Sequence, residues 1–219
     1  MASPFLPAAS RSTYAMAQDR YAVMGNPIAH SKSPRIHTLF ARQTGQALTY
    51  EAILVALDGF RGAVARFHAE GGKGLNITVP FKREAWALVD TRSERAELAG
   101  AVNTMVLRPD GSRFGDNTDG VGLVRDLTAN HGVTLRGRRV LMLGAGGAVR
   151  GALQPLLEQA PASITVANRT VDKALELARS FGEPVRGCGY ADLEGSFDLI
   201  INGTAASLAG AVPPLPETS

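Results

Sequence analysis

The chain has 219 residues, of which 45% are hydrophobic and 20% are charged, a composition typical of a globular protein with one large or two modest domains. Its net charge of +3 comes from basic residues scattered along the chain, and the densest cluster, RGRR at 136–139, fits a solvated turn better than a nucleic-acid surface. No apolar run reaches the length of a membrane span. We therefore expect a small-molecule partner rather than a nucleic acid or a membrane.

Two further features concern the cellular location. Residues 1–17 lack the basic start and the apolar core of a secretory signal, and we expect a disordered extension there. The single cysteine, Cys188, excludes an internal disulfide and indicates a reducing, cytoplasmic compartment; we interpret its thiol as inert. The oligomeric state, monomer or homodimer, stays open.

In chain order, residues 18–117 show the spacing of a first α/β domain. Ser33 and Pro34 resemble a helix start with Ser33 as the N-cap, and Gly45 can end that helix. The turn Pro109-Asp110-Gly111 predicts a hairpin between the last two strands. The expected strands lie at 20–24, 48–55, 75–79, 101–107 and 113–114, and the expected helices at 33–44, 59–70, 81–89 and 94–98.

Residues 118–219 show a different pattern. A helix at 118–130 leads into a continuously apolar strand at 139–143, the kind that is buried on both faces. After it, a glycine-rich turn with a helix, a strand at 163–167, a helix at 171–181 and strands at 184–186 and 197–201 give βαβαβ alternation. We therefore expect an α/β protein whose second domain, 118–219, is a Rossmann-like, doubly wound parallel sheet.

Polar residues gather at the end of the central strand of the first domain. Leu75, Ile77 and Val79 alternate with Asn76 and Thr78, and Pro80 stops the strand. Lys82 follows in the first turn of a helix, where the positive end of the helix dipole disfavours a cation. Lys82 could be an ordinary solvated lysine on the surface. However, α/β proteins bind ligands at such strand ends, and we therefore favour a functional role for Lys82.

The stretch Gly144-Ala145-Gly146-Gly147-Ala148 follows a buried strand and opens a helix. Glycines there let a pyrophosphate approach the backbone at the amino end of the helix. The third glycine of the GxGxxG pattern is replaced by Val149, and a tight turn of purely structural purpose is the alternative. The strand before and the helix and strand after it favour a dinucleotide site.

The end of the next strand indicates which dinucleotide binds. NAD sites usually carry Asp or Glu at this point, but this chain has Asn168-Arg169-Thr170, with Lys173 one turn later. A guanidinium and an ammonium group suit a 2′-phosphate. The alternative, a surface charge at a helix start, leaves the missing acid unexplained, and the sequence predicts NADP as the cofactor.

Asp119 lies in the first turn of the linking helix, where a carboxylate can act as a simple cap. It can also pair with Lys82 across the cleft between the domains, and we favour this second interpretation. The four histidines show no spacing typical of metal ligands, and we expect no metal: they are His30, His37, His68 and His131.

Six ordered motifs together resemble shikimate dehydrogenase: GNPIAHSKSPRIH, GGKGLNITVPFK, LAGAVNT, GDNTDGVG, LGAGGAVRG and ANRT. The resemblance extends from Tyr21 to about Thr204 and implies a substrate-binding α/β domain at 18–117 followed by an NADP-binding domain. It implies reduction of 3-dehydroshikimate to shikimate with NADPH, a step of aromatic amino-acid biosynthesis, with Lys82 as general acid/base and Asp119 as its partner on the substrate.

The resemblance also implies roles for other residues. Ser31 and Ser33 would bind the substrate carboxylate, and Asn76, Thr78 and Asn103 would bind the ring hydroxyls. The residues that would bind the cofactor are Gly144, Ala145, Gly146, Gly147, Ala148, Asn168, Arg169, Thr170, Lys173 and, by a weaker match, Glu94.

The sequence departs from the family pattern after the strand at 197–201, where Ala205-Ala206 and the tail VPPLPETS stand in place of a further strand and a returning helix. We expect a carboxyl-terminally incomplete second domain. Two alternatives remain open: a quinate/shikimate dehydrogenase that uses NAD, and a non-catalytic module that binds NADP and substrate.

Overall fold

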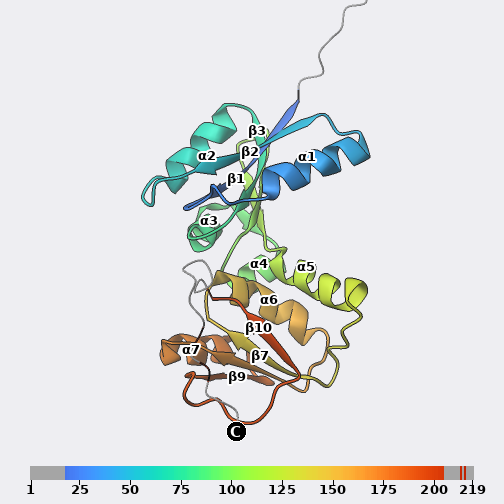
Figure 1. Cartoon of the computed structure of the whole chain (residues 1–219). Coiled ribbons are helices and arrows are strands. Elements are labelled where there is room, and N and C mark those ends of the chain that lie inside the picture. The colour runs from blue at the N-terminus through green and yellow to red at the C-terminus, as the bar shows by residue number, and fades with distance from the viewer. Residues whose placement is uncertain (1–17, 205–212, 214, 216–219) are drawn as a thin grey trace, which may run out of the picture.

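The computed structural model describes residues 18–204, 213 and 215. These residues form two α/β bodies, one above the other, with α4, α5 and α6 at the junction between them (Figure 1). The expected extension at 1–17 and most of the segment after residue 204, including Ala205 and Ala206, lie outside the described residues.

The first body contains a mixed sheet with helices on both faces. Its elements are β1 (Asp19–Gly25), α1 (Ser33–Thr44), β2 (Leu48–Leu54), α2 (Phe60–Ala69), β3 (Gly72–Ile77), α3 (Lys82–Leu88), β4 (Thr91–Arg92), α4 (Glu94–Ala99), β5 (Thr104–Leu107) and β6 (Arg113–Asp116). The strand order is β2-β1-β3-β5-β6-β4. Strands β2, β1 and β3 are parallel, whereas β5 is antiparallel to both β3 and β6. The predicted β5–β6 hairpin is thus present.

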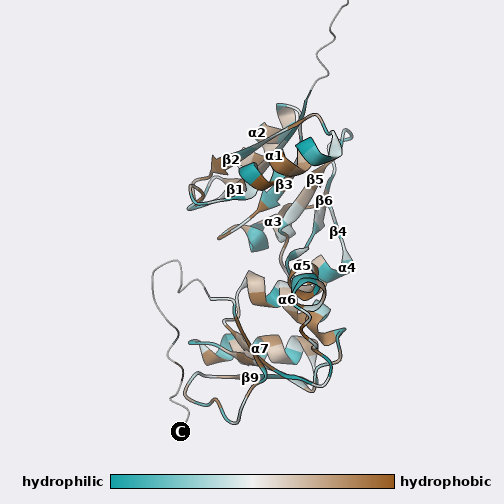
Figure 2. Cartoon of the chain, turned by 45° about the vertical axis from the view of Figure 1, so that its right-hand side comes forward, coloured by the Kyte–Doolittle hydropathy of each residue, from teal (hydrophilic) through white to brown (hydrophobic). Residues whose placement is uncertain are grey.

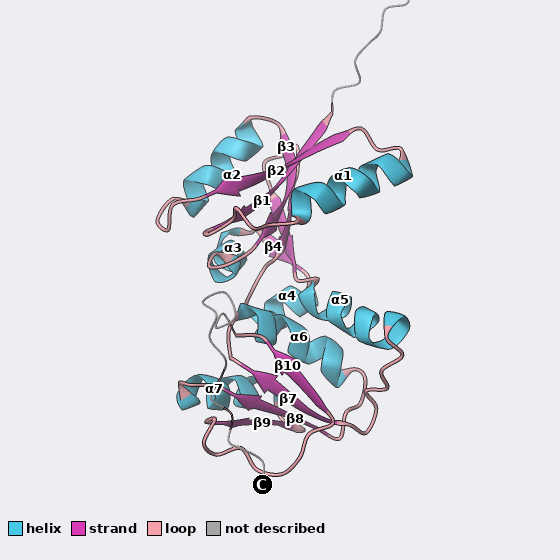
Figure 3. Ribbon diagram, in the orientation of Figure 1, coloured by secondary structure: helices cyan, strands magenta, loops and turns pink. Residues whose placement is uncertain are grey.

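The second body contains a four-stranded parallel sheet. Its elements are α5 (Asp119–Arg125), the π-helix η1 (Asp126–Asn130), β7 (Arg139–Leu143), α6 (Gly147–Leu157), β8 (Ser163–Ala167), α7 (Val171–Phe181), β9 (Val185–Cys188) and β10 (Leu199–Asn202). The order β10-β7-β8-β9 winds outward from β7 in both directions, which confirms the predicted doubly wound sheet (Figure 3).

Alternate residues of β7 belong to two separate cores, which explains why that strand is apolar throughout. Val140 and Met142 pack with α5, α6 and α7, whereas Leu141 and Leu143 face a smaller cluster that includes half-buried Cys188. Burial raises the pKa of the Cys188 thiol, in keeping with an inert residue. Each of these three helices packs on the core around Val140 and Met142 with one face only. Figure 2 shows this for α7, along which hydrophobic and hydrophilic residues alternate.

Two wrong predictions of local structure bear on the site. Ser33 is the first helical residue rather than the N-cap: Lys32 takes the cap position without a side-chain bond, and the Ser33 N–H donates to Oγ of Ser31. The central strand ends at Ile77 rather than at Val79, because the Val79 carbonyl turns to accept a bond from the N–H of Asn26. Thr78 and Val79 therefore belong to a turn that leads directly to Lys82.

Candidate active site

Lys82 and Asp119 meet at the junction of the two bodies. Lys82 is the first residue of α3 and Asp119 the first residue of α5, and Nζ of Lys82 lies 2.5 Å from Oδ2 of Asp119. The preceding Phe81 is buried and stacks on Phe60 with ring centroids 5.0 Å apart, which anchors the start of α3. The carbonyl of Lys82 also accepts a bond from the N–H of Val102. The structure thus brings the two residues predicted to be catalytic into direct contact.

Asn103 holds the other oxygen of the Asp119 carboxylate. Its Nδ2 donates to Oδ1 of Asp119 at 2.7 Å and to Oγ1 of Thr118 at 3.0 Å. Its Oδ1 accepts from the hydroxyl of Thr104 at 2.9 Å and from the N–H of Thr118 at 3.0 Å. Because Asn103 is buried and both ends of its amide are bonded, it fixes the orientation of Asp119 toward Lys82.

The same network continues to Asn76 and beyond. Nδ2 of Asn76 lies 3.4 Å from both the carbonyl of Asn103 and Oγ1 of Thr104, and its Oδ1 accepts from the phenol of Tyr50 at 2.6 Å. Ser33 is near enough to this phenol to act on its pKa, against the larger effect of burial. Polar groups from Tyr50 to Lys82 therefore form one connected chain, which we call the polar chain. Its members are Tyr50, Asn76, Thr104, Asn103, Asp119 and Lys82.

Three residues of this region were not singled out by sequence reasoning: Tyr50, Thr104 and Thr118. Thr104 and Thr118 directly follow or precede predicted site residues, and that adjacency is the signal that could have found them. Tyr50 lies on another strand, and no local pattern indicates it. The predicted residue Thr78 lies on the turn after β3, where a side chain at Gly25 would come within 2.4 Å of the Thr78 methyl group. Among the described contacts its hydroxyl is not a member of the polar chain.

The glycine-rich turn lies beside Lys82. Gly144 has a φ of 102°, which favours glycine, and its N–H donates to the carbonyl of Ala167. A Cβ at Gly146 would meet no atom within 4 Å, whereas one at Gly147 would lie 3.7 Å from the Lys82 side chain. Helix α6 begins at Gly147, so its amino end and the open space at Gly146 adjoin the Lys82–Asp119 pair. This geometry suits a pyrophosphate in contact with the backbone.

Val149, which replaces the third glycine, is fully buried against Gly203. A Cβ on Gly203 would lie 2.5 Å from a methyl group of Val149. The small residue that this packing needs is therefore supplied by the loop after β10 instead of by the helix, which explains the imperfect motif.

The candidate 2′-phosphate residues follow β8 at the start of α7. Asn168 is fixed by a bond from its Nδ2 to the carbonyl of Thr170 and by a bond from its N–H to the carbonyl of Cys188. Arg169 and Lys173 are exposed, and in the described part of the chain neither has an ion pair with a carboxylate. Free cations next to a helix amino end can accept an added phosphate.

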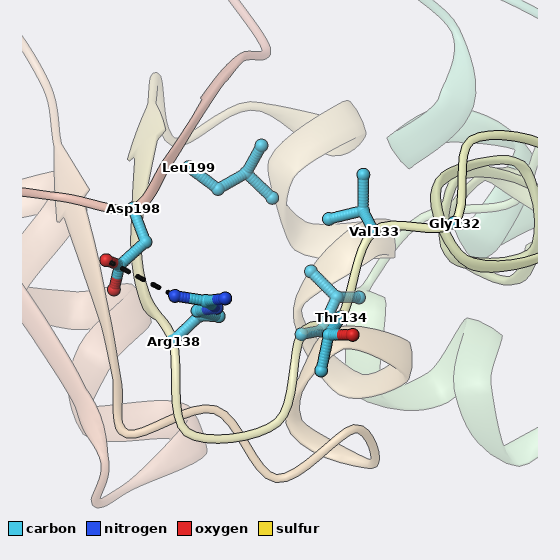
Figure 4. A pocket seen from close by; sticks show the side chains of 7 residues that line it. Gly132, Val133, Thr134, Arg138, Asp198 and Leu199 are labelled. Atoms are coloured by element: carbon cyan, nitrogen blue, oxygen red, sulfur yellow. Dashed lines mark ion pairs between the residues drawn. The ribbon is translucent and has the colours of Figure 1, made fainter.

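Glu94 does not join the glycine-rich turn. It is the first residue of α4 and lines a hollow of about 340 Å³ with Arg95, Gln154 and Glu158, so that it lies about two turns along α6 from Gly147. A second hollow, of about 400 Å³, lies at the amino ends of β7 and β10 (Figure 4). The glycine-rich turn follows the opposite, carboxyl end of β7. In the second hollow Arg138 lies 3.9 Å from Asp198, which fits the interpretation of residues 136–139 as a turn.

Arg95 and Asp116 connect α4 to the end of β6 close to the site. Nε of Arg95 donates to Oδ1 of Asp116 at 2.7 Å, a second guanidinium nitrogen contacts Oδ2, and the Ser93 hydroxyl also donates to Oδ1. These bonds hold the pKa of Asp116 below its ordinary value, and the bond from Arg95 has the largest effect. The folded state therefore gains stability from the ionised form of Asp116.

Replacing Arg95 with methionine should lower the free energy of unfolding at neutral pH by up to about 1 kcal/mol, since the pair is partly exposed. A carboxylate with a depressed pKa contributes above its unfolded value and loses this contribution as the pH falls through its folded value. The difference between parent and variant should thus shrink below pH 3.8. Denaturant unfolding at a series of pH values measures it, with Arg61→Met, at an exposed arginine of α2, as the control. A pH-independent difference would show that Arg95 acts by packing alone.

Among the described residues, none of the helices has the length and apolar character needed to cross a membrane. Within the same residues, no three His, Cys, Asp or Glu side chains are grouped as metal ligands.

Comparison with known proteins finds relatives over both bodies. Residues 23–105 match the family model "Shikimate dehydrogenase substrate binding domain" and residues 126–209 match "Shikimate / quinate 5-dehydrogenase". A shikimate dehydrogenase (NADP(+)) of Hahella chejuensis is 63% identical over 201 residues, which cover 91% of this chain and 74% of the relative.

Solved structures agree with this result. An Ael1 enzyme from Pseudomonas putida has a TM-score of 0.83 and 52% identity, and the match covers 91% of this chain and 74% of that one. A shikimate 5-dehydrogenase from Thermus thermophilus, solved in complex with NADP(H) and shikimate, has a TM-score of 0.80 and 36% identity with the same coverage.

Proposed function

The chain belongs to the shikimate dehydrogenase family, and on this premise we propose that it catalyses the reversible, NADP-dependent interconversion of 3-dehydroshikimate and shikimate in aromatic amino-acid biosynthesis. The observation that carries the proposal is the Lys82–Asp119 pair, with its 2.5 Å separation, beside the amino end of α6. A proton donor thereby adjoins the turn that suits a dinucleotide, which is the arrangement that reduction of a ketone requires.

The roles of the two residues follow from their chemistry. In the direction of reduction, Nζ of Lys82 gives a proton to the ketone oxygen while the carbonyl carbon accepts a hydride, so that one C–H and one O–H bond form. Bound NADPH supplies the hydride. Asp119 holds the lysine in place and accepts a bond from the same substrate oxygen once it is a hydroxyl. In the direction of oxidation Lys82 takes this proton back, and Asp119 supports the resulting ammonium group.

The remaining substrate contacts are assigned by the position of each side chain. Ser31 and Ser33 lie at the start of α1, and their hydroxyls can donate to a carboxylate. Asn76 and Asn103 are members of the polar chain and Thr78 lies on the turn after β3, and we assign all three to the ring hydroxyls. The assignment is supported by the connected bonds from Tyr50 to Asp119.

NADP fits the second body. The backbone from Gly144 to Ala148 would bind the pyrophosphate, where a Cβ at Gly146 would meet open space. Asn168, Arg169, Thr170 and Lys173 would hold the adenosine ribose and its 2′-phosphate. We assign Glu94 to the contact between α4 and α6, because it lines the hollow that contains Gln154.

We also propose a domain organisation in which residues 18–117 bind the substrate and residues 118–219 bind NADP. We further propose a cytoplasmic enzyme, a monomer or a homodimer, that acts on a small molecule. The single cysteine and the modest, scattered charge support this proposal.

Cofactor preference is the most direct binding test. Arg169→Ala should weaken NADP binding by about 10- to 100-fold, because it removes a charge-assisted bond, and should leave NAD binding unchanged. Titration calorimetry with both dinucleotides measures the two affinities. Arg179→Ala, at an exposed arginine in the last turn of α7, the helix that begins two residues after Arg169, is the matched control. Equal affinity of the parent for NAD and NADP would refute the assignment.

The reaction itself is tested by following nicotinamide absorbance with shikimate or quinate and either dinucleotide. We expect shikimate with NADP to be the preferred combination. Quinate with NAD as the preferred pair would favour the first alternative. Tight NADP and shikimate binding without any turnover would identify a non-catalytic module.

A further inference from the structure

Tyr50 occupies a distinctive place on the sheet of the first body. It lies on β2, opposite Tyr21 of β1, and lines a hollow of about 390 Å³ that also reaches Asn76 and Thr104. Its ring stacks on His37 of α1 with centroids 4.1 Å apart and planes 1° from parallel. The ring is therefore clamped between a helix and the sheet, so that its hydroxyl has a fixed position.

The phenol is a permanent hydrogen-bond donor at this position. Burial raises the pKa of Tyr50 to about 12, so the phenol stays protonated at neutral pH. The phenol donates to Oδ1 of Asn76 at 2.6 Å. Since an amide oxygen can only accept, the direction of donation is set: from Tyr50 to Asn76.

This direction determines how Asn76 is presented. A side-chain amide has an acceptor end and a donor end of nearly equal shape, and its neighbours decide which way it faces. Tyr50 occupies the acceptor end at short range. The donor end has only two partners among the described residues, both at the long distance of 3.4 Å, so its protons remain available to a stronger acceptor.

We propose that Tyr50 is a positioning residue for substrate binding: it locks the amide of Asn76 so that Nδ2 faces the substrate as a donor. The inference rests on the proposed function, which assigns a ring hydroxyl of the substrate to Asn76.

The test is Tyr50→Phe, which removes only the hydroxyl and keeps the ring on His37. The KM for shikimate should rise by about 10-fold, because Oδ1 of Asn76 loses its half-buried donor, whereas kcat should change less than about twofold. The affinity for NADP should not change. Tyr21→Phe is the matched control, since it removes a phenol from the same hollow that has no described bond to Asn76.

A double-mutant cycle separates positioning from general support of the sheet. If Tyr50 acts through Asn76, Tyr50→Phe should have little further effect on shikimate affinity in an Asn76→Ala background. Additive effects, or an unchanged KM in Tyr50→Phe when Asn76→Ala raises it, would overturn the inference and leave the proposed function intact.

A measurement without substrate tests the role of Tyr50 even if the protein does not bind shikimate. The side-chain NH₂ signals of Asn76 in ¹H–¹⁵N spectra should shift and broaden in Tyr50→Phe but not in Tyr21→Phe. If the parent neither binds nor oxidises shikimate, the proposed function fails, and unchanged Asn76 signals would show separately that Tyr50 does not lock the amide.

Discussion

Replacing Lys82 with alanine should lower kcat for shikimate oxidation by about 10²–10⁴-fold, the usual effect of losing a general acid or base. KM for shikimate should change much less, because the carboxylate and the ring hydroxyls keep their own partners. NADP affinity should be unaffected. Steady-state kinetics together with calorimetry measure all three quantities.

A second substitution distinguishes proton transfer from charge. Lys82→Arg retains a cation that can pair with Asp119, but a guanidinium group does not lose its proton at any accessible pH. We therefore expect Lys82→Arg to be nearly as inactive as Lys82→Ala. Arg83→Ala, at the exposed neighbouring cation of α3, should behave like the parent. Near-normal turnover in Lys82→Arg would show that only the charge of Lys82 matters.

Replacing Gly120 with alanine should be the second most damaging change. A Cβ at Gly120 would lie 2.2 Å from the carbonyl oxygen of Gly151 and 2.8 Å from Pro155, so α5 must move away from α6. Because that oxygen belongs to the backbone, no side chain can turn aside to make room. Overpacking of this kind typically lowers the free energy of unfolding by about 1–3 kcal/mol.

The same shift should affect catalysis, because Asp119 directly precedes Gly120 and α6 carries the glycine-rich turn. A displacement of about 1 Å between reacting groups can reduce turnover by about 10²-fold. Gly122→Ala is the matched control: it lies on the same helix, and a Cβ there meets no atom within 4 Å. The Tm and kcat should both be lower in Gly120→Ala than in the parent, and both should be unchanged in Gly122→Ala. Equal behaviour of the two variants would refute a close contact between α5 and α6.

The second body was largely predictable from the sequence, because its signals are local. The bounds of β7, β8 and α7 agree with the expected 139–143, 163–167 and 171–181. A strand buried on both faces needs an unbroken apolar run, and an amphipathic helix needs its own 3.6-residue period. Neither signal depends on which distant segment packs against it.

The first body was less predictable, because some of its elements exist only through pairing. Strand β4 has two residues and is held by a ladder with β6, so no period can reveal it. The bond from Tyr50 to Asn76 joins residues 26 positions apart, and it requires the register of β2, β1 and β3. The contact between Lys82 and Asp119 was predictable, because the sequence pattern indicates that Lys82 follows a strand end and that Asp119 starts the linking helix.

Two site predictions were limited by competing partners. Ser33 looks like an N-cap by residue type, but it is itself the first residue of α1, and its N–H donates to Oγ of Ser31. Glu94 matches a family position near the cofactor, yet it follows the cap Ser93 of α4 and lines the hollow that contains Gln154 of α6. In both cases residue type was informative, and neighbouring residues decided the role.

The exposure of Arg169 and Lys173 has a consequence for how such enzymes diverge. An exposed cation without an ion pair can be replaced with a change of no more than about 0.5 kcal/mol in the free energy of unfolding. Members of the polar chain lack this freedom, because each half-buried or buried polar group is the partner of another. In the history of this lineage, cofactor preference should therefore drift by single substitutions, whereas a new substrate class requires several changes at once.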